Sequence, residues 1–313
     1  STQESNLDSS VWEWDGGQWL RESHAPPAAR SGAAVATDPV HDRVILYGGE
    51  SINRSMADTW VREQGAWSLV VPHPSSSTQG HPGVLRGPGL VYDSARDEAL
   101  LLGGTTGVFR FYRLAGTQWQ AITPANVPPG RERTAAVYDS LRQRVILFGG
   151  SSNSQTFGDT WAWDGTTWTE LTPSISPSPR ESPGLAYDEL RDRVVLHGGG
   201  FSAWQNDTWE FDGALWGRCN TTSPLPGTLS PPLAYDRVRQ VTVAQRVQST
   251  PLQLETWQWD GSGWSRLVGI SIPSTRTAAS LVATANDVLM IGGRIGPDYA
   301  SDHFSLATSS IAT

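Results

Sequence analysis

One stretch of this sequence departs from five similar ones, and its polar residues are the first candidates for chemistry. Five segments end in Gly-Gly: RVILYGG (43–49), EALLLGG (98–104), RVILFGG (144–150), RVVLHGG (193–199) and DVLMIGG (287–293). In the sixth, QVTVAQR (240–246), we align Gln245 and Arg246 with the glycines, and Thr242 and Ala244 with apolar positions. His197 occupies the Ala244 position of the preceding segment. Loss of a large side chain leaves space, so we expect a small polar pocket near the axis, where these strands converge.

These residues suggest proton-transfer chemistry if the pocket is catalytic. His197 is the candidate general acid or base, and Glu50 the candidate second proton carrier. Arg246 and Arg294 would stabilise developing negative charge. Glu50 and Arg294 each follow a Gly-Gly pair in neighbouring units, so we expect them to form an ion pair.

The same residues also have a structural interpretation. Repeats tolerate divergence, and a lone interior histidine is more often hydrogen-bonded than catalytic. The aromatic side chains of Phe201 and Trp204, in a nearby loop, favour a pocket because a ligand site combines apolar walls with a few polar groups. Both interpretations, divergence and a site, stay open.

Arginines recur at one position of the pattern. Arg30, Arg131 and Arg180 each precede a Tyr or its equivalent by seven residues, Arg276 is the equivalent residue of the last unit, and Arg86 is offset by one. One arginine per unit can hold neighbouring loops together by several hydrogen bonds. The alternative is an anion-attracting mouth for a carboxylate, phosphate or acidic sugar.

Composition excludes several function classes. The formal charge is −8 and the pI is about 5.2, which argues against a nucleic-acid partner. No apolar run approaches the length of a membrane span, so we expect a soluble chain without membrane insertion. All 23 basic residues are arginine, which excludes lysine nucleophiles and Schiff bases. The compartment, secreted or cytoplasmic, stays open.

Metal and cysteine chemistry are not expected. Cys219 is the only cysteine, so no internal disulfide forms and cysteine-cluster metal sites are excluded. The histidines show no paired spacing of metal ligands, and we predict no metal and no cofactor.

The elements that must position these residues repeat about every 48 residues. The unit is clearest at 131–168, where TAAVY and RVILF flank a turn at Asp139, and TWAW is followed by the hairpin signal Asp164-Gly165. Each unit is therefore predicted to form four antiparallel strands. We place the units at about 30–72, 86–124, 131–173, 180–224, 228–268 and 276–307 in one domain covering 1–313. The recurrent tryptophans, such as Trp161 and Trp209, are expected to pack between sheets.

The pattern YD…RVILFGG…DTWxWDGxxW resembles the kelch repeat over nearly the whole chain. The resemblance implies an all-β, six-bladed kelch β-propeller of four-stranded blades. We expect VWEWDGGQW (11–19) to close the last blade by joining the two chain ends, although SDHFSLA (301–307) competes for the same third-strand position. The copper-radical and iron-dependent sites of kelch relatives have no matching residues here.

In such a unit the turns after YD and at WDG share one tight rim, and the loops after Gly-Gly share the opposite, variable face. Because variable loops on a rigid frame usually carry binding, we expect function on the loop face. Three functions fit: a binding propeller that captures a small polar or anionic molecule, a glycan or a protein segment; a cofactor-independent isomerase, similar in kind to the kelch epimerase that mutarotates sialic acid, or a cyclase; and a protein-interaction scaffold with an exposed patch around Trp204. We expect a monomer.

Overall fold

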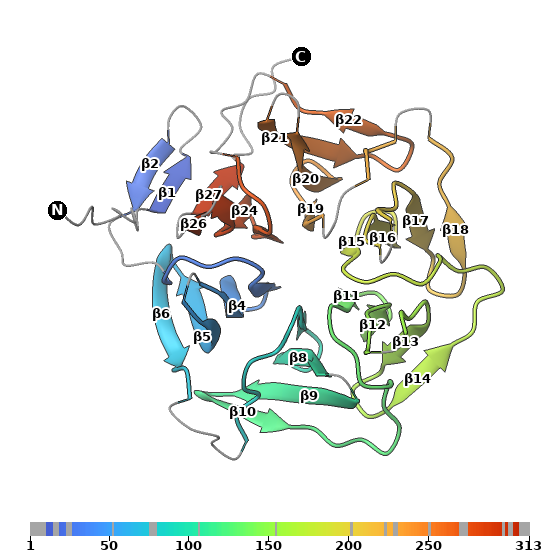
Figure 1. Cartoon of the computed structure of the whole chain (residues 1–313), viewed down its shortest axis with the longest axis horizontal. Coiled ribbons are helices and arrows are strands. Elements are labelled where there is room, and N and C mark those ends of the chain that lie inside the picture. Colours follow the sequence, from blue (N-terminus) through green and yellow to red (C-terminus); the bar gives the residue numbers. More distant parts are fainter. Residues whose placement is uncertain are drawn as a thin grey trace.

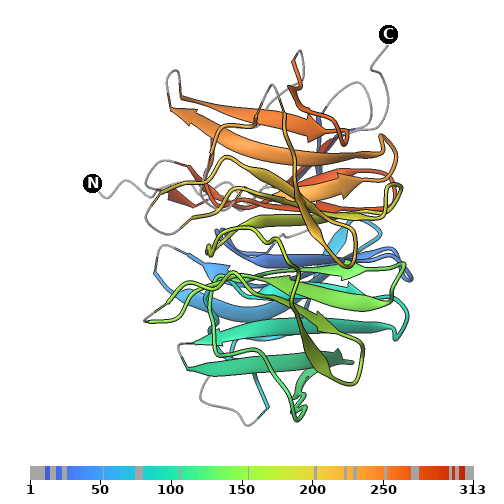
Figure 2. The same cartoon turned by 90° about the vertical axis from the view of Figure 1, so that its right-hand side faces the viewer.

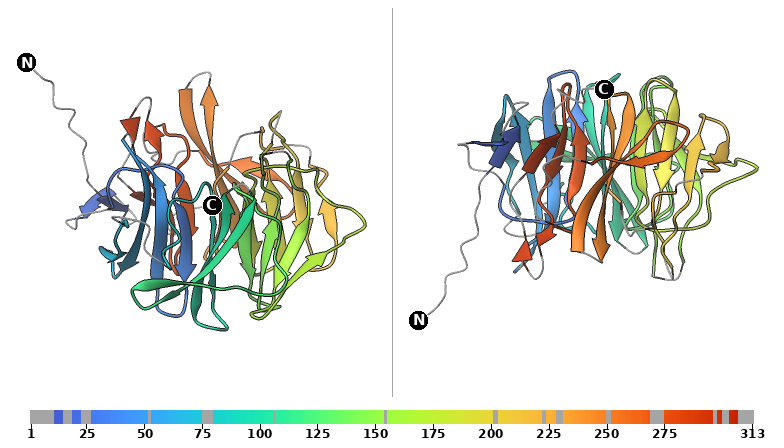
Figure 3. Two further views of the ribbon diagram at one scale, coloured as in Figure 1. Left: turned by 60° about the horizontal axis from the view of Figure 1, so that its bottom comes forward. Right: turned by 90° about the horizontal axis from the view of Figure 1, so that it is seen from above.

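The computed structural model shows β-sheets arranged around a central axis (Figure 1). It describes residues 11–14, 19–22, 27–51, 53–74, 80–105, 107–153, 155–200, 203–221, 224–227, 231–249, 252–268, 275–295, 298–299 and 303–306. In Figure 2 the strands run across the view between two rims, and Figure 3 shows neighbouring sheets side by side. Among the described residues, no helix is long and apolar enough to cross a membrane.

Five sheets have four antiparallel strands each, and we number them as blades in chain order. Blade one contains β3 (Ala34–Asp38), β4 (Arg43–Glu50), β5 (Ser55–Glu63) and β6 (Ala66–Val71). Blade two contains β7 (Gly89–Asp93), β8 (Glu98–Thr105), β9 (Val108–Ala115) and β10 (Gln118–Ala121). Blade three contains β11 (Ala135–Asp139), β12 (Arg144–Phe148), β13 (Thr160–Trp163) and β14 (Trp168–Leu171). Blade four contains β15 (Gly184–Asp188), β16 (Arg193–His197), β17 (Thr208–Phe211) and β18 (Trp216–Arg218), and blade five contains β19 (Leu233–Asp236), β20 (Val241–Ser249), β21 (Leu252–Trp259) and β22 (Trp264–Arg266).

The number of complete blades differs from the prediction, because the structure has five four-stranded sheets and not six. The remaining units are a three-stranded sheet of β23 (Ser280–Ala283), β24 (Val288–Ile291) and β27 (His303–Leu306), and the two-stranded sheets β25 (Arg294–Ile295) with β26 (Asp298–Tyr299) and β1 (Val11–Trp14) with β2 (Trp19–Glu22). The C-terminal strand β27 pairs with β24 and therefore takes the third-strand position. The strands β1 and β2 pair with each other beside β27, so the predicted closure by joined chain ends is not recorded among the described strand pairings.

Apolar side chains fill the space between neighbouring sheets because successive residues of a strand point to opposite faces. In β12, Val145 and Leu147 pack toward blade two, whereas Ile146 and Phe148 pack toward blade four. Tryptophans of the outer strands complete these layers, and Trp161, for example, packs against the side chains of blade two, as predicted. The core is thus divided among the junctions between sheets, and the packing at each junction holds its two neighbouring sheets in place relative to each other.

The first strand of each unit lies innermost. Strands β3, β7, β11, β15, β19 and β23 each contact the next one around the axis, and β23 contacts β3. Residues of these six strands line a cavity of about 230 Å³ toward the loop face and one of about 190 Å³ toward the tight rim. The expectation that the second strands converge at the axis is therefore wrong, since the first strand of each unit occupies that space.

Candidate functional site

The loop-face mouth of the channel is built by backbone at the start of each unit. Its walls include Gly32, Gly87, Arg133, Ser182 and Ala278, all of which have positive φ. The amide of Ser182 donates to the carbonyl of Arg133 at 2.8 Å, and that of Arg133 to the carbonyl of Arg86 at 3.0 Å. The inner ends of blades two, three and four are therefore joined directly, which gives the mouth a rigid rim.

Four of the recurring arginines donate hydrogen bonds within their own units and do not face a ligand. They are Arg30, Arg131, Arg180 and Arg276, each at most 2% exposed. In blade three, Nη1 and Nη2 of Arg131 donate to the two carboxylate oxygens of Asp159 at 2.6 and 2.7 Å, and Nη1 also donates to the carbonyl of Gly149 at 3.1 Å.

The other units repeat this arrangement. Arg30 pairs with Asp58, and Arg180 pairs with Asp207. Arg276 donates to the carbonyl of Gly292 at 3.2 Å. The anion-attracting mouth expected from these four residues is thus wrong, because their guanidinium groups are buried and engaged within the protein.

Arg86 does not take the arginine position of blade two. Strand β7 begins four residues after Leu85, as β11 does after Arg131, so the buried Leu85 lies where other blades have the anchoring arginine. The position opposite the first glycine, which is Asp159 in blade three, is Arg110 in blade two, and Arg110 donates to the carbonyl of Pro82 at 2.8 Å. Arg86 is exposed, and no interaction of its side chain occurs within the described part of the chain. Its guanidinium thus lies beside the channel mouth without an ion-pair partner among the described residues.

Arg133 adds a second positive charge at the same mouth. Its side chain is 45% exposed, and only Nη1 is engaged, by Glu181 at 3.0 and 3.1 Å. A Cβ atom on Gly87, the residue after Arg86, would lie 3.0 Å from Cα of Arg133, so the two backbones touch. Sequence analysis did not single out Arg133, but the one-residue offset of Arg86 was a visible signal that it is not an anchor.

Strand pairing in blade five corrects the sequence alignment by one residue. Asp236 pairs with Val241, whereas its equivalent Asp188 pairs with Arg193. Gln245, and not Ala244, is therefore the equivalent of His197, and the Gly-Gly pair is replaced by Arg246-Val247. The turn of blade five has the same length as that of blade four, so the error arose because residues 240–246 were not aligned by their distance from the Tyr-Asp pair.

The divergence of blade five is explained by a compensating ion pair. Glu255 takes the place of the third-strand aspartate, and Nη1 of Arg246 donates to its Oε2 at 3.1 Å. Glu255 is 3% exposed and also accepts from Arg266 at 2.9 Å and from the indole of Trp257 at 3.0 Å. Without glycines the β20–β21 ladder continues to Ser249. Arg246 thus supplies from the strand the guanidinium that the inter-blade loop supplies elsewhere.

His197 lies in the core between blades four and five. Its imidazole is 0% exposed, its Nδ1 is 3.0 Å from the hydroxyl of Thr208, and its ring meets Trp264 edge-on at 5.3 Å. The indole of Trp264 donates to the same hydroxyl at 2.8 Å. Burial lowers the pKa of His197 to about 4, so it is neutral at pH 7. The aromatic ring of Phe148 makes the equivalent contact in blade three, so this placement favours the structural interpretation of His197.

Three buried polar atoms near this divergence have no partner within the described structure: Nε2 of His197, Oγ1 of Thr242 and Oε1 of Gln245. Because strand residues alternate, Ala244 and Thr242 face blade four, and Gln245 faces the three-stranded sheet. Gln245 and His197 therefore lie in different junctions. The structure does not bring the predicted pocket residues together in one cavity.

The remaining candidates are spread over the loop face. Glu50 and Arg294 are exposed and form isolated backbone bridges to Ser31 and Thr277 respectively. Trp204 is 57% exposed, and Phe201 lies outside the described residues. Cys219 is a free thiol whose pKa burial raises to about 12, so it is not a nucleophile at neutral pH.

The tight rim carries one group that offers metal-ligand atoms. Asp38, His41 and Asp97 place one such atom each within 4.8 Å of one another. Asp38 is already engaged, since Nε of Arg43 donates to Oδ2 at 2.9 Å and Nδ1 of His41 lies 2.9 Å from the same oxygen. The donors around Asp38 argue for an ion-pair network at this turn. Sequence analysis missed this group because its members belong to two units.

No protein-family model matches this sequence, and no curated protein matches it. A solved structure titled "Structure of YjhT" is similar to 91% of this chain and 97% of that chain, with a TM-score of 0.69 and 11% sequence identity. At this identity the similarity concerns the fold alone. Together with the sheet topology it shows that the chain is an all-β propeller of four-stranded antiparallel blades.

Proposed function

We propose that this chain is a kelch-type binding propeller that captures a small anionic molecule at the loop-face mouth of its channel. The observation that supports this most is the exposed side chain of Arg86, which lies beside Arg133 and has no partner among the described residues. Guanidinium groups bind carboxylates and phosphates through paired, charge-assisted hydrogen bonds. Two such groups near a cavity of about 230 Å³ suit a small ligand with one or two anionic groups.

The surrounding structure supports a preformed site. The backbone bonds from Ser182 to Arg133 and from Arg133 to Arg86 fix the positions from which the two side chains extend. Ligand binding then costs little conformational entropy, which favours a high affinity. We favour binding over turnover because His197, the candidate base, is fully buried away from this mouth.

The test is calorimetric titration of the protein with phosphate, succinate and, as a neutral probe, glucose. We expect phosphate or succinate to bind and glucose to give no signal. Arg86→Gln and Arg133→Gln should each weaken anion binding at least about tenfold, as expected for a lost charge-assisted hydrogen bond. Arg113→Gln is the matched control, because Arg113 is 49% exposed on β9 and pairs with Glu98. Anion binding that is equally strong in all variants, or absent in the wild type, would overturn the proposal.

A further inference from the structure

The turns of the tight rim carry aliphatic side chains at one repeated position. The residue two after the turn aspartate is Val40, Leu141, Leu190 or Val238 in four blades, with exposures of 55, 66, 61 and 50%. The equivalents Ala95 and Ala285 are also exposed. The turn itself does not need these side chains, since the aspartate already accepts its amide hydrogens, as Asp139 accepts from the Arg142 amide at 3.0 Å. We call these six residues the aliphatic tips.

The aliphatic tips surround the second mouth of the channel. The residues directly before them line its cavity of about 190 Å³: Pro39, Ser94, Ser140, Glu189 and Arg237. Deeper in the cavity lie Tyr92, Tyr138, Tyr187 and Tyr235. Burial raises the pKa of Tyr138 and of Tyr235 to about 12, so both phenols stay neutral. The walls of this mouth therefore combine apolar side chains with the hydroxyl groups of Ser94 and Ser140, and Glu189 and Arg237 form an ion pair there.

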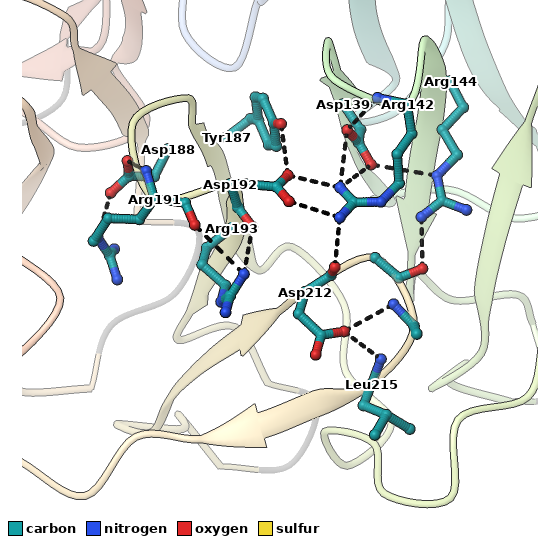
Figure 4. A network of polar contacts seen from close by, with 12 residues as sticks. Asp139, Arg142, Arg144, Tyr187, Asp188, Arg191, Asp192, Arg193, Asp212 and Leu215 are labelled. Carbon is teal, nitrogen blue, oxygen red and sulfur yellow. Dashed lines mark hydrogen bonds and ion pairs between the residues drawn. The ribbon is translucent and has the colours of Figure 1, made fainter.

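Arginines close to the tips are engaged within the protein (Figure 4). Arg142 pairs with Asp139 and, through Nη1 and Nη2 at 2.6 Å each, with both carboxylate oxygens of Asp192. Its Nη2 also donates to the carbonyl of Asp212 at 2.8 Å. Arg96 and Arg191 make ion pairs of the same kind with the aspartates three residues before them. Their positive charge is thus balanced locally.

Carboxylates farther from the axis have guanidinium groups nearby but form no such ion pairs within the described residues, because Arg96 and Arg142 donate to the backbone carbonyls of Asp164 and Asp212. Asp164, Asp212 and Asp260, in the turns between third and fourth strands, accept hydrogen bonds through Oδ1 from their own turns. No guanidinium pairs with these carboxylates within the described residues. Backbone amides, first those of Thr167 and Leu215, lower the pKa of Asp164 and Asp212, so both stay ionised.

We propose that the tight rim docks a partner protein segment that presents aliphatic side chains flanked by lysine or arginine. The aliphatic tips would contact the apolar centre of that segment, and the outer carboxylates would pair with its basic flanks. Six exposed aliphatic side chains recur around this mouth, and complementary charge would steer the encounter with a partner. A second copy of this chain fits poorly, because its own outer carboxylates would face those of the first copy and repel them.

The test compares two synthetic peptides of equal length, one alternating leucine with lysine and one alternating leucine with glutamate. We expect the Leu-Lys peptide to bind in fluorescence anisotropy and the Leu-Glu peptide not to bind. The double variant Leu141→Ser/Leu190→Ser should weaken binding at least tenfold, and Asp164→Asn/Asp212→Asn should weaken it and reduce its dependence on salt. Val108→Ser is the matched control, since Val108 is 57% exposed at the turn between β8 and β9, where strand direction places it on the opposite rim.

The alternative occupants give distinct results. The proposal would be overturned if the Leu-Lys peptide does not bind, or if the Leu141→Ser/Leu190→Ser change leaves its binding unaffected. Concentration-dependent dimerisation of the wild type in analytical ultracentrifugation, lost in that double variant, would also overturn it by assigning the face to a second copy. Leu141→Ser/Leu190→Ser and Val108→Ser concern exposed side chains without hydrogen bonds, so their thermal unfolding should match the wild type. Asp164→Asn/Asp212→Asn keeps an acceptor oxygen for the turn amides but loses the charge, so a small decrease in stability is expected there.

Discussion

The ion pair of Arg246 with Glu255 should behave as a buried, structural interaction, and a double-mutant cycle can measure it. Glu255 is 3% exposed and the Arg246 side chain 18%. Arg246→Ala removes one charge-assisted hydrogen bond, which contributes about 1.5–3 kcal/mol to the free energy of unfolding. The full cost of about 3–5 kcal/mol for breaking a buried pair is not expected, because Arg266 and Trp257 still donate to the carboxylate.

We therefore expect Arg246→Ala to lower the free energy of unfolding by about 2 kcal/mol, or the melting temperature by about 3 °C for a chain of this length. Combining Arg246→Ala with Glu255→Gln should reveal a coupling energy of about 1–2 kcal/mol in urea unfolding. Arg266→Ala is the matched control, since this side chain is 46% exposed and its pair should contribute less than about 1 kcal/mol.

The coupling should also persist at high salt, because buried pairs are screened less than exposed ones. A coupling energy indistinguishable from zero, or an Arg246→Ala change as mild as Arg266→Ala, would refute the reasoning. The divergence of blade five would then be unexplained by compensation.

Three further changes test the inter-blade packing. His197→Phe should flatten the pH dependence of the free energy of unfolding. In the wild type the folded-state pKa of about 4 lies below the unfolded value of about 6.5, so the stability is complete above pH 6.5 and falls by up to about 3 kcal/mol as the pH drops toward 4. An unchanged pH profile in the variant would contradict this. Gln245→Leu should raise the free energy of unfolding by about 1 kcal/mol in urea titrations, because it removes an unpartnered buried carbonyl, and a loss would reveal a missing partner. Trp168→Phe should cost about 1 kcal/mol less than Trp216→Phe, because only the indole of Trp216 donates a hydrogen bond, to Thr160 at 2.9 Å; equal costs would show that the bond contributes nothing.

Periodicity predicted the propeller because each unit repeats its own local signals. The Asp-Gly hairpin at Asp164, the turn at Asp139 and the alternating core of β12 all appear in the structure as expected. These features depend on neighbours in sequence, so a single chain reveals them. The completeness of the last sheet depends instead on which terminus pairs with β24, and local signals do not decide that.

The candidate site was less predictable, because its meaning depends on partners in other strands. Gly-Gly loss looked like a pocket at Gln245 and Arg246, but the partner Glu255 lies on the next strand, and an alignment error of one residue hid the equivalence of Gln245 with His197. Arg30 and Arg86 look alike in sequence but take different positions. Arg30 lies four residues before β3 and is a buried anchor, whereas Leu85 has that position before β7 and Arg86 follows it as an exposed charge.

The central claim is that Arg86 and Arg133 together bind anions at the loop-face mouth of the channel. The most direct measurement is calorimetric phosphate titration of Arg86→Gln/Arg133→Gln, beside the wild type and the control Arg113→Gln. We predict that the double change weakens phosphate binding at least about tenfold, that Arg113→Gln leaves it unchanged, and that unfolding stability stays within about 1 kcal/mol of the wild type. Phosphate binding to the double variant as tight as to the wild type would contradict the claim.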